Sequence, residues 1–332
     1  MERVHLAAAR DHVRGHADGA DRPALPLARR GSGDPRLAAR HGRNDDHAGA
    51  AAHRLRLCRA APDPRHHHGL VPVSPPVTEP RTEIASHRGG AAHWPENSET
   101  AFRETAKLAV EQIEFDVQMS ADAVPVIFHD TTLDRMTDGS GPLAERTLAE
   151  LKALSITAGG GRILTLDEGL DLLAPTHLIL RCEIKPGPGM RPYPALREAT
   201  LARLSERGLL CRTVLTSFHL PTLRAARTQA EADALRDLIW LIADPIIRLT
   251  SPWDVARLAE EAGIDHVAPH IATLRDGALA PLRAAGLRVG AFAVLGDDSI
   301  AWALGQELTV FTTDRPIAAL ELRDGGACSS KR

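Results

Sequence analysis

Strand-like and helix-like segments alternate along most of this chain, from residue 82 to near the C-terminus. Short runs of β-branched and aliphatic residues are followed by longer segments whose apolar residues recur at helical spacing. The short runs predict strands at 83–87, 112–117, 177–184, 213–217, 237–242, 265–268, 287–292 and 308–312. The longer segments predict helices at 98–110, 166–173, 194–207, 219–229, 252–262, 273–285 and 297–304, and a last one from 316. Such alternation is typical of a parallel sheet with helical crossovers.

The number of strand–helix units separates the two common parallel architectures. Eight units in roughly 240 residues match the size of a (β/α)8 barrel, the TIM barrel of the α/β class. The alternative is an open, doubly wound sheet, which commonly carries Gly-x-Gly-x-x-Gly after its first strand. No such motif follows 83–87. We therefore expect a TIM-barrel domain over residues 82–322 and a flexible tail at 323–332.

One interval interrupts this alternation. Residues 130–165 contain glycine-rich stretches at 138–142 and 159–161 and only one short helix candidate, at 147–153. The loops that bind substrate in TIM barrels follow the carboxyl ends of the strands. We therefore expect a small insertion after strand 2, placed at the mouth of the barrel.

Residues 1–80 differ in composition from the rest of the chain. They contain 13 Arg, no Lys, nine of the 16 His, and no Ile, Phe, Trp or Tyr. Such a segment buries too little apolar surface to offset the entropy of ordering, so we expect it to be disordered. Its Arg-, Ala- and Pro-rich sequence also fits translated GC-rich DNA upstream of a gene. A true translation start near 71–77 is therefore the alternative to a native N-terminal segment.

Composition excludes several classes of function. The 332 residues carry a formal net charge of −3, which argues against a polybasic nucleic-acid binder. No apolar run approaches the roughly 18 residues of a membrane span, and no secretory signal core is present, so we expect no stable membrane anchor. The four cysteines (Cys58, Cys182, Cys211 and Cys328) lack Cys-x-x-Cys spacing, which favours free thiols and a cytoplasmic location. The oligomeric state stays open.

Three carboxylates are predicted to point into the barrel. Apolar residues alternate with Glu114 and Asp116 in the second strand, and with Glu183 and Lys185 around the third. A period of two places Glu114 and Asp116 on one face, about 7 Å apart. Buried like charges repel unless they share a proton or a cation, and carboxylate oxygens suit hard divalent ions. We expect one Mg²⁺ or Ca²⁺ on Glu114, Asp116 and Glu183, with Lys185 facing a phosphate; the alternative is a solvated strand face.

Two histidines end predicted strands in the same region. His87 ends the first strand, and His129 ends the apolar run 124–128. Histidine titrates near neutral pH, so a pair can act as general base and general acid, although a structural role is the alternative for each. Arg88, next to His87, offers a planar fork for two phosphate oxygens. The sequence leaves open which histidine is the base.

Three further residues are candidates for the substrate pocket. Glu96 precedes a helix cap, where it either touches the site or favours the helix dipole. Ser217 ends the fourth strand facing inward, where it would be an additional donor. His270 follows the sixth strand and either lines the mouth or is structural. No Gly-x-Ser-x-Gly motif is present, so we do not expect acyl-enzyme chemistry.

These motifs resemble those of the glycerophosphodiester phosphodiesterase family, whose members share the barrel of the phospholipase C-like phosphodiesterases. The resemblance covers roughly residues 82–322. It rests on 86–90 (SHRGG), 95–98 (PENS), 114–117 (EFDV), 126–130 (VIFHD), 133–137 (LDRMT), 183–185 (EIK), 217–218 (SF) and 313–316 (TDRP). The family implies metal-dependent hydrolysis of glycerophosphodiesters, which are small-molecule substrates, to sn-glycerol 3-phosphate and an alcohol. It also implies that a glycerol hydroxyl of the substrate is the nucleophile, giving a cyclic phosphate that water opens.

One segment departs from the family pattern. The seventh strand of the family usually carries Trp-Thr-Val-Asn, whereas residues 292–295 read Phe-Ala-Val-Leu. Phe292 keeps an aromatic face for the expected substrate pocket but loses the indole N–H. Because this change concerns substrate preference, two alternatives stay open. One is a lysophospholipase D-like phosphodiesterase, and the other is a catalytically silent barrel that binds phosphorylated ligands.

Overall fold

The computed structural model of the chain describes residues 81–157, 159 and 161–329. All of them belong to one compact unit, Asp46–Arg332. The expected disorder of residues 1–80 and the alternative start near 71–77 fall outside the described residues, so both stay predictions.

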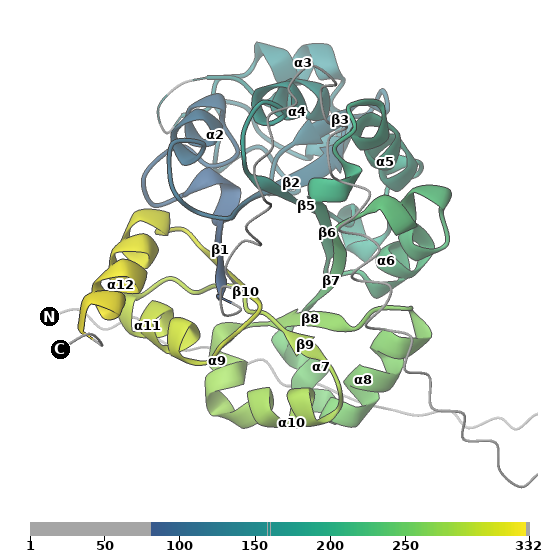
Figure 1. Cartoon of the computed structure of the whole chain (residues 1–332). Helices are drawn as coiled ribbons and strands as arrows, with labels where there is room; N and C mark the ends of the chain where they lie inside the picture. The colour runs from purple at the N-terminus through teal and green to yellow at the C-terminus, as the bar shows by residue number, and fades with distance from the viewer. Residues whose placement is uncertain (1–80, 158, 160, 330–332) are drawn as a thin grey trace, which may run out of the picture. The chain divides into compact units, whose positions relative to one another are not determined.

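Eight parallel strands form the central sheet. They are β1 (Glu83–Ser86), β2 (Gln112–Met119), β5 (Ile179–Ile184), β6 (Thr213–Ser217), β7 (Asp237–Ile242), β8 (His266–Pro269), β9 (Arg288–Val289) and β10 (Val310–Thr313). Their order is β10-β1-β2-β5-β6-β7-β8-β9. A parallel bridge between Ala291 and Phe311 joins the two ends of this order, so the sheet closes into a barrel (Figure 1). The predicted (β/α)8 barrel is therefore confirmed.

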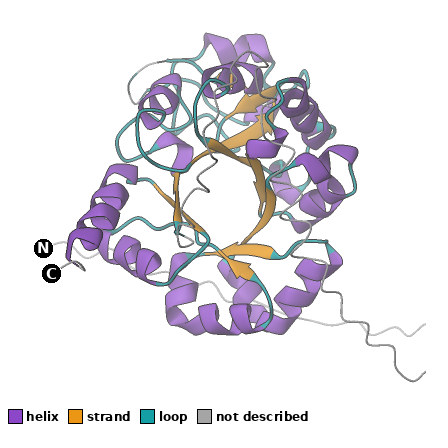
Figure 2. Cartoon of the chain, viewed as in Figure 1, coloured by secondary structure: helices purple, strands orange, loops and turns teal. Residues whose placement is uncertain are grey.

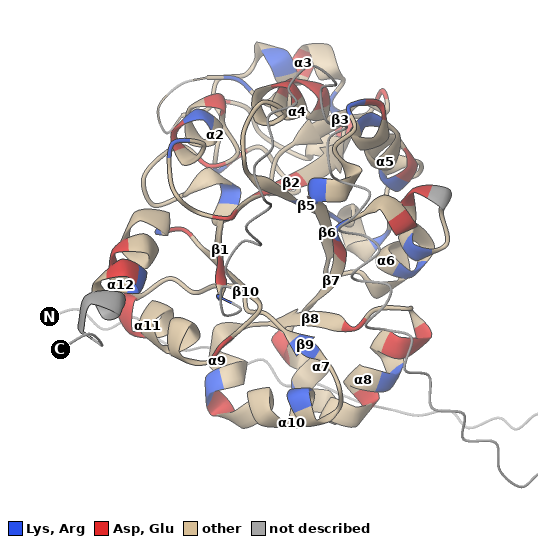
Figure 3. Cartoon of the chain, in the orientation of Figure 1, with Lys and Arg blue, Asp and Glu red and all other residues tan. Residues whose placement is uncertain are grey.

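Helices surround the barrel, as Figure 2 shows. The α-helices are α2 (Glu99–Thr105), α3 (Leu148–Ala153), α4 (Leu166–Leu173), α5 (Leu196–Glu206), α6 (Leu220–Arg227), α7 (Asp244–Leu249), α8 (Pro252–Glu261), α9 (Ile271–Thr273), α10 (Leu279–Ala284), α11 (Asp297–Gly305) and α12 (Pro316–Ser329). Single turns of other helix types occur at η1 (His87–Gly89), η2 (Leu143–Glu145), η3 (Pro188–Met190), η4 (Leu210–Arg212), η5 (Ala230–Ala234) and η6 (Leu274–Ala278). Basic and acidic residues both occur along the outer helices (Figure 3).

In β2, strand alternation separates an apolar outer face from carboxylates on the inner face. Ile113, Phe115 and Val117 of β2 are fully buried in the core between the strands and the helices. Glu114 and Asp116 lie between them on the opposite face and are also buried. A side chain that alternates in this way points into a closed barrel. The second strand therefore delivers two carboxylates to the barrel interior, as its sequence predicts.

The insertion after β2 is a small antiparallel extension of the sheet with a core of its own. Strand β3 (Pro125–Ile127) pairs with β2 and with β4 (Leu164–Thr165), both antiparallel. Its apolar cluster comprises Val126, Phe128, Leu133, Met136, Leu143, Leu151, Ile156 and Ile163. The insertion thus begins at β3, a few residues before its predicted boundary at residue 130. This cluster fixes the segment that follows β3, where His129 lies.

Two predicted elements near the end of the barrel are interrupted. The predicted helix 273–285 is divided into α9, the π-type turn η6 and α10, because Gly277 has a φ of 108° that no regular helix accommodates. The predicted strand 287–292 is regular only over β9. Beyond it, Phe292 forms a single bridge to His270, and Ala293 has a positive φ of 59° that ends extended pairing.

Two helix ends also differ from their predicted positions. The predicted helix 98–110 ends at Thr105, whose hydroxyl donates to the carbonyl of Gly89. Helix α12 continues to Ser329, into the segment 323–332 that was predicted as a flexible tail. Arg323 anchors this extension: its Nη1 donates to both carboxylate oxygens of Glu111, at 2.8 and 2.9 Å.

Candidate active site

A cavity of about 370 Å³ lies at the carboxyl ends of the barrel strands. Its walls carry both polar and apolar side chains: His87, Arg88, Glu114, His129, Arg181, Glu183, Thr216, Phe218, Leu241, Phe292, Ala293, Leu295, Thr312 and Asp314. The carboxyl end of the strands is where TIM-barrel active sites are found. The structure thus brings both predicted histidines and two of the three predicted metal ligands to one cavity.

Three carboxylates form a compact cluster beside this cavity. Glu114, Asp116 and Glu183 each offer one ligand oxygen, and these oxygens lie within 4.8 Å of one another. Asp116 Oδ1 and Glu183 Oε1 are buried, and the ammonium group of Lys185 is the cation beside both of them. Three buried carboxylate oxygens gathered at this spacing fit a hard divalent cation. The predicted metal ligands therefore meet as the strand pattern indicates.

The protonation of this cluster reflects its crowding. Burial, followed by the charge of Asp116, raises the pKa of Glu114. Burial also disfavours the charged form of Asp116, but its interactions with Lys185, His129 and Arg88 outweigh it and lower the pKa of that carboxyl. A further positive charge at the cluster would favour the ionised form of Glu114.

Two side chains supply positive charge beside the cluster. Lys185 Nζ lies 3.1 Å from Glu183 Oε1 and 3.5 Å from Asp116 Oδ1. Arg88 Nε lies 3.4 Å from Asp116 Oδ2, and its Nη1 donates to Glu96 Oε1 at 3.0 Å. Both predicted phosphate-binding cations are thus at the site, and each is paired with carboxylates.

A tight turn after β1 holds Arg88 in place. Arg88 has a φ of 50°, and its backbone N–H donates to Glu114 Oε2 at 2.9 Å. The next residue, Gly89, has a φ of 78°, and a Cβ there would lie 2.7 Å from the Cβ of Ala101. Only glycine fits this position without a shift of helix α2. The Arg-Gly pair therefore fixes the corner from which His87 and Arg88 face the cavity.

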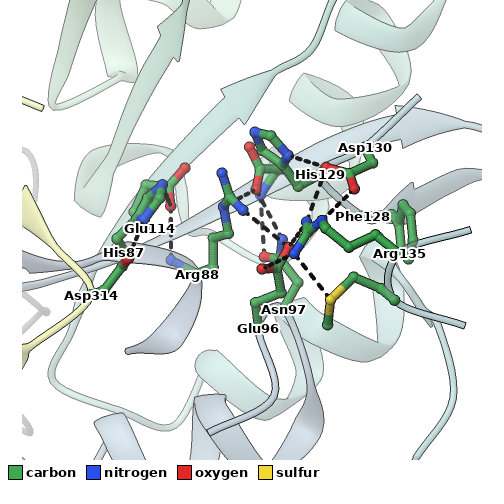
Figure 4. A network of polar contacts seen from close by, with 12 residues as sticks. His87, Arg88, Glu96, Asn97, Glu114, Phe128, His129, Asp130, Arg135 and Asp314 are labelled. Atoms are coloured by element: carbon green, nitrogen blue, oxygen red, sulfur yellow. Dashed lines mark hydrogen bonds and ion pairs between the residues drawn. The ribbon is translucent and has the colours of Figure 1, made fainter. Parts of the chain in front are cut away.

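The first histidine is paired with an aspartate from the opposite end of the barrel sequence. His87 Nδ1 and Asp314 Oδ1 are 2.5 Å apart (Figure 4). Burial lowers the pKa of His87, but the hydrogen bond to Asp314 and the charge of Glu114 outweigh it, so the pKa lies above its ordinary value. An ionised carboxylate only accepts, so Nδ1–H donates to Asp314 and Nε2 is left for the substrate.

The second histidine has the same arrangement with its neighbour in sequence. His129 Nδ1 lies 2.6 Å from Asp130 Oδ1. Arg135 holds Asp130 from the other side, with Nε at 2.6 Å from Oδ2. Burial disfavours the charge of Asp130, but Arg135 and His129 outweigh it and lower the pKa of Asp130 to about 2. The carboxylate is therefore ionised, and it orients Nε2 of His129 as Asp314 orients that of His87.

Glu96 connects the two histidine regions. Its carboxylate accepts from Arg88 Nη1 at 3.0 Å and from Arg135 Nη2 at 2.6 Å (Figure 4). Burial opposes its ionisation, but the hydrogen bond from Arg135 and the charge of Arg88 lower the pKa of Glu96. Of the two roles that the sequence leaves open for Glu96, contact with the site is therefore the observed one.

The backbone next to His129 is held by a buried amide. Gln118 Nε2 lies 2.9, 3.0 and 2.7 Å from the carbonyl oxygens of Phe128, His129 and Asp130. The hydroxyl of Tyr193 donates to Gln118 Oε1 at 3.0 Å. These contacts fix the loop that presents His129.

The remaining pocket candidates have different outcomes. Phe292 lines the cavity and contacts the ring of Phe218 edge-on at 5.2 Å. Ser217 is not among the residues that line it, and its hydroxyl donates to the carbonyl of Ile184 at 2.7 Å on the neighbouring strand. His270 caps α9 by accepting from the backbone N–H of Ala272, and its ring packs against Phe292. These contacts correspond to the structural role, the second of the two roles that the sequence leaves open for His270.

Four site residues were not found as such from the sequence. Asn97, Asp130, Arg135 and Asp314 were included in the sequence analysis only as parts of the family-like motifs. Asn97 Nδ2 donates to Asp116 Oδ2 at 2.9 Å, which orients a metal-ligand carboxylate. A carboxylate directly after His129 was the one local signal that could have identified a histidine partner.

A separate question is whether the chain crosses a membrane. Over residues 81–157, 159 and 161–329, every helix is too short or too polar to span a bilayer.

Comparison with known sequences bears directly on this site. The sequence profile of the glycerophosphoryl diester phosphodiesterase family matches residues 87–318, which include both histidines and all three carboxylates. The chain belongs to this family. The resemblance noted in the motifs is therefore confirmed over most of the barrel.

Individual relatives agree with this assignment. A glycerophosphodiester phosphodiesterase of Caldanaerobacter subterraneus subsp. tengcongensis is 34% identical over 156 residues, which are 45% of this chain and 63% of that protein. Human glycerophosphodiester phosphodiesterase 1 is 39% identical over 84 residues, 25% of each chain. The chain thus matches less than two thirds of the length of these curated relatives.

Solved structures share the fold over a longer range. A protein of Agrobacterium tumefaciens, provisionally assigned as a glycerophosphoryl diester phosphodiesterase, is 35% identical with a TM-score of 0.70, covering 75% of this chain and 99% of its own. An Oleispira antarctica phosphodiesterase, solved with the product sn-glycerol-3-phosphate, is 24% identical with a TM-score of 0.61. The match covers 74% of this chain and 97% of that protein. At this identity, the similarity to the Oleispira antarctica structure supports the fold of this chain.

Proposed function

We propose that this family member is a metal-dependent phosphodiesterase that hydrolyses glycerophosphodiesters to sn-glycerol 3-phosphate and an alcohol. The observation that carries the proposal is the convergence of two histidine–aspartate pairs and a three-carboxylate cluster on one cavity. Binding alone needs no such pair of proton carriers. The Oleispira antarctica phosphodiesterase, which has sn-glycerol-3-phosphate bound, supports the choice of product.

Glu114, Asp116 and Glu183 would hold one divalent cation, Mg²⁺ or Ca²⁺. When bound, such a cation supplies Lewis-acid stabilisation of charge on phosphoryl oxygens. Asn97 fixes Asp116, and the N–H of Arg88 fixes Glu114, so two of the three ligands are oriented by the chain. Arg88 and Lys185 would neutralise the charge that develops on the phosphate in the transition state.

The two histidines would move the protons. One Nε2 accepts the proton of a substrate glycerol hydroxyl as that oxygen forms a bond to phosphorus. The P–O bond to the alcohol breaks, and the Nε2 of the other histidine donates a proton to the leaving oxygen. Water then opens the cyclic phosphate by the reverse proton transfers. Asp314 and Asp130 keep both Nε2 atoms directed at the substrate throughout.

The direct test is hydrolysis of glycerophosphocholine by the full chain, with Mg²⁺, Ca²⁺ or EDTA, followed by enzymatic detection of glycerol 3-phosphate. We expect product with a metal, none with EDTA, and a loss of about 10²-fold or more in His129→Ala. His177→Ala is the matched control, because His177 is exposed and precedes β5 at the far end of the barrel. A folded, metal-bound protein without turnover would instead indicate the silent binding barrel.

One observation favours a second candidate, the lysophospholipase D-like activity. The residues that line the cavity include four large apolar side chains, those of Phe218, Leu241, Phe292 and Leu295. Such side chains suit the acyl chain of a single-chain lipid. Release of choline from lysophosphatidylcholine, compared with glycerophosphocholine under the same conditions, separates the two candidates.

A further inference from the structure

One cation in the cavity has no role in the proposed chemistry. Arg181 of β5 is 1% exposed, and it is among the largest fully buried side chains of the described residues. It lines the cavity, yet its Nη1 and Nη2 atoms are buried without a hydrogen-bond partner in the described part of the chain. A buried guanidinium without acceptors is costly, so a native site is expected to provide acceptors for it.

Carboxylates already lie in the surroundings of Arg181. Glu114, Asp237 and Glu183 act electrostatically on its guanidinium. These carboxylates act through space, because none of them is hydrogen-bonded to the Nη atoms. Arg181 therefore lacks neutral hydrogen-bond acceptors rather than another anion.

Thr216 presents a matching group. Its Oγ1 is buried and unpartnered within the described residues, and the residue lines the same cavity. Thr216 pairs in register with Glu183 on the neighbouring strand, and Arg181 lies two residues before Glu183, away from the mouth. Guanidinium donors and a hydroxyl that both donates and accepts are what an alcohol oxygen requires.

Apolar side chains pack the barrel interior around this pair. Small and aliphatic side chains fill the barrel interior, namely Ala85, Val214, Ile239, Ala268 and Val310. A substrate can therefore extend only toward the mouth. Of the two halves of a glycerophosphodiester, the alcohol varies and the glycerol is constant, so the glycerol half suits the inner end.

We propose that Arg181 and Thr216 form a subsite for the free terminal hydroxyl of the glycerol half of the substrate. The assignment rests on the proposed function, and it narrows the substrate class. A diester whose terminal glycerol oxygen carries an acyl chain would bring hydrocarbon against a buried guanidinium. The subsite therefore selects deacylated glycerophosphodiesters over lysophospholipids.

Binding of two phosphates tests the subsite without turnover. The full chain with Mg²⁺ is titrated calorimetrically with sn-glycerol 3-phosphate and with 1,2-propanediol 1-phosphate, which lacks only the terminal hydroxyl. We expect the glycerol compound to bind roughly 10- to 100-fold more tightly, as for a hydrogen bond to a charged group. Equal affinities, or no binding of either compound by the folded protein, would overturn the proposal.

Two variants assign the preference to these residues. Thr216→Val keeps the shape of the side chain and removes the hydroxyl. Arg181→Lys keeps the positive charge but loses the planar guanidinium group with its paired N–H donors. Each should reduce the ratio of the two affinities by at least about threefold, and Thr200→Val, a buried threonine on α5 bonded to the Leu196 carbonyl, should not. An unchanged ratio in both folded variants would contradict the assignment.

Hydrolysis distinguishes failure of the subsite from failure of the function. Efficient cleavage of lysophosphatidylcholine by the wild-type chain would overturn the subsite and leave a phosphodiesterase. Absence of any hydrolysis, combined with the expected binding ratio, would overturn the enzymatic proposal and keep the subsite.

Discussion

His87 and Asp314 are 227 positions apart in the sequence, and their side chains are joined by a hydrogen bond between Nδ1 and Oδ1. The pair forms because β1 lies directly beside β10, with Ser86 in register with Thr313. Each residue follows its strand immediately, so barrel closure brings them together. One of the two proposed proton carriers is thus oriented by a contact between the first and last strands.

Asp314→Asn should therefore reduce kcat more than it changes KM. The amide cannot hold Nδ1–H as the carboxylate does, and we expect roughly a 10- to 100-fold loss in kcat. The pKa of His87 should fall, because the hydrogen bond that His87 donates to Asp314 is the main contribution raising it. The pH–rate profile with glycerophosphocholine measures both effects. Asp298→Asn, at an exposed position of α11, should leave the profile unchanged.

Gly89→Ala should destabilise the barrel by about 2–4 kcal/mol, combining a left-handed backbone with a forced contact. The new Cβ would lie 2.7 Å from the Cβ of Ala101. Gly208→Ala is the matched comparison, because Gly208 also has a positive φ, of 65°, but nothing within 4 Å of a Cβ. It should cost only about 1 kcal/mol. Urea denaturation measures both, and equal losses would refute the contact argument.

Metal binding should stabilise the protein in the absence of substrate. A cation that relieves repulsion among Glu114, Asp116 and Glu183 binds the folded state, and at 100 times Kd it adds about 2.7 kcal/mol. Differential scanning calorimetry with Mg²⁺ or Ca²⁺ should show a higher Tm, which EDTA reverses. Glu183→Gln should weaken the metal affinity at least about tenfold, whereas Glu260→Gln, on the surface of α8, should not. A Tm independent of metal would count against the cluster as a cation site.

A second buried network predicts pH-dependent stability at the opposite end of the barrel. Asp237 accepts from His266 Nδ1 at 2.9 Å and from Arg288 Nη1 at 2.8 Å. Burial opposes its charge, but these partners outweigh it and lower the pKa of Asp237. A lowered carboxyl pKa stabilises the fold above the unfolded pKa, and the stabilisation is lost as the pH falls toward the folded value.

Asp237→Asn should therefore cost about 3 kcal/mol at pH 7, since it leaves Arg288 and His266 without their buried partner. The difference from wild type should shrink as the pH falls below about 4, because the wild-type carboxylate is then protonated on unfolding. Denaturant unfolding at pH 7, 5 and 3 measures it. A constant difference over this range would show that the carboxylate charge is not responsible.

The sequence predicts those parts of the molecule that depend on local patterns. The period of two in β2 places Glu114 and Asp116 inside the barrel, and the alternation of strands with helices gives the closed parallel sheet. His129 and Asp130 are adjacent, so their contact needs no tertiary knowledge. The roles of these residues in binding and catalysis stay predictions.

Contacts that depend on the closure of the barrel and on the register between its strands could not be predicted from the sequence. An aspartate before Arg315 and Pro316 reads as a helix start, and only the pairing of β1 with β10 reveals Asp314 as a partner of His87. Ser217 was expected to face inward, but its neighbour Thr216 lines the cavity, so strand alternation places Ser217 on the opposite face, where its hydroxyl donates to the Ile184 carbonyl. Arg181 has an inward position in the pattern, but its unpartnered nitrogen atoms become apparent only in the packed interior.

Closure of the barrel by its first and last strands has a consequence for biosynthesis. The ribosome adds β10 only after the other seven strands of the barrel have been synthesised. Until Asp314 leaves the exit tunnel, a nascent chain contains His87 but lacks the carboxylate that orients it. The activity proposed for this protein is thereby coupled to completion of translation through the last strand, and chains truncated before β10 should accumulate without it.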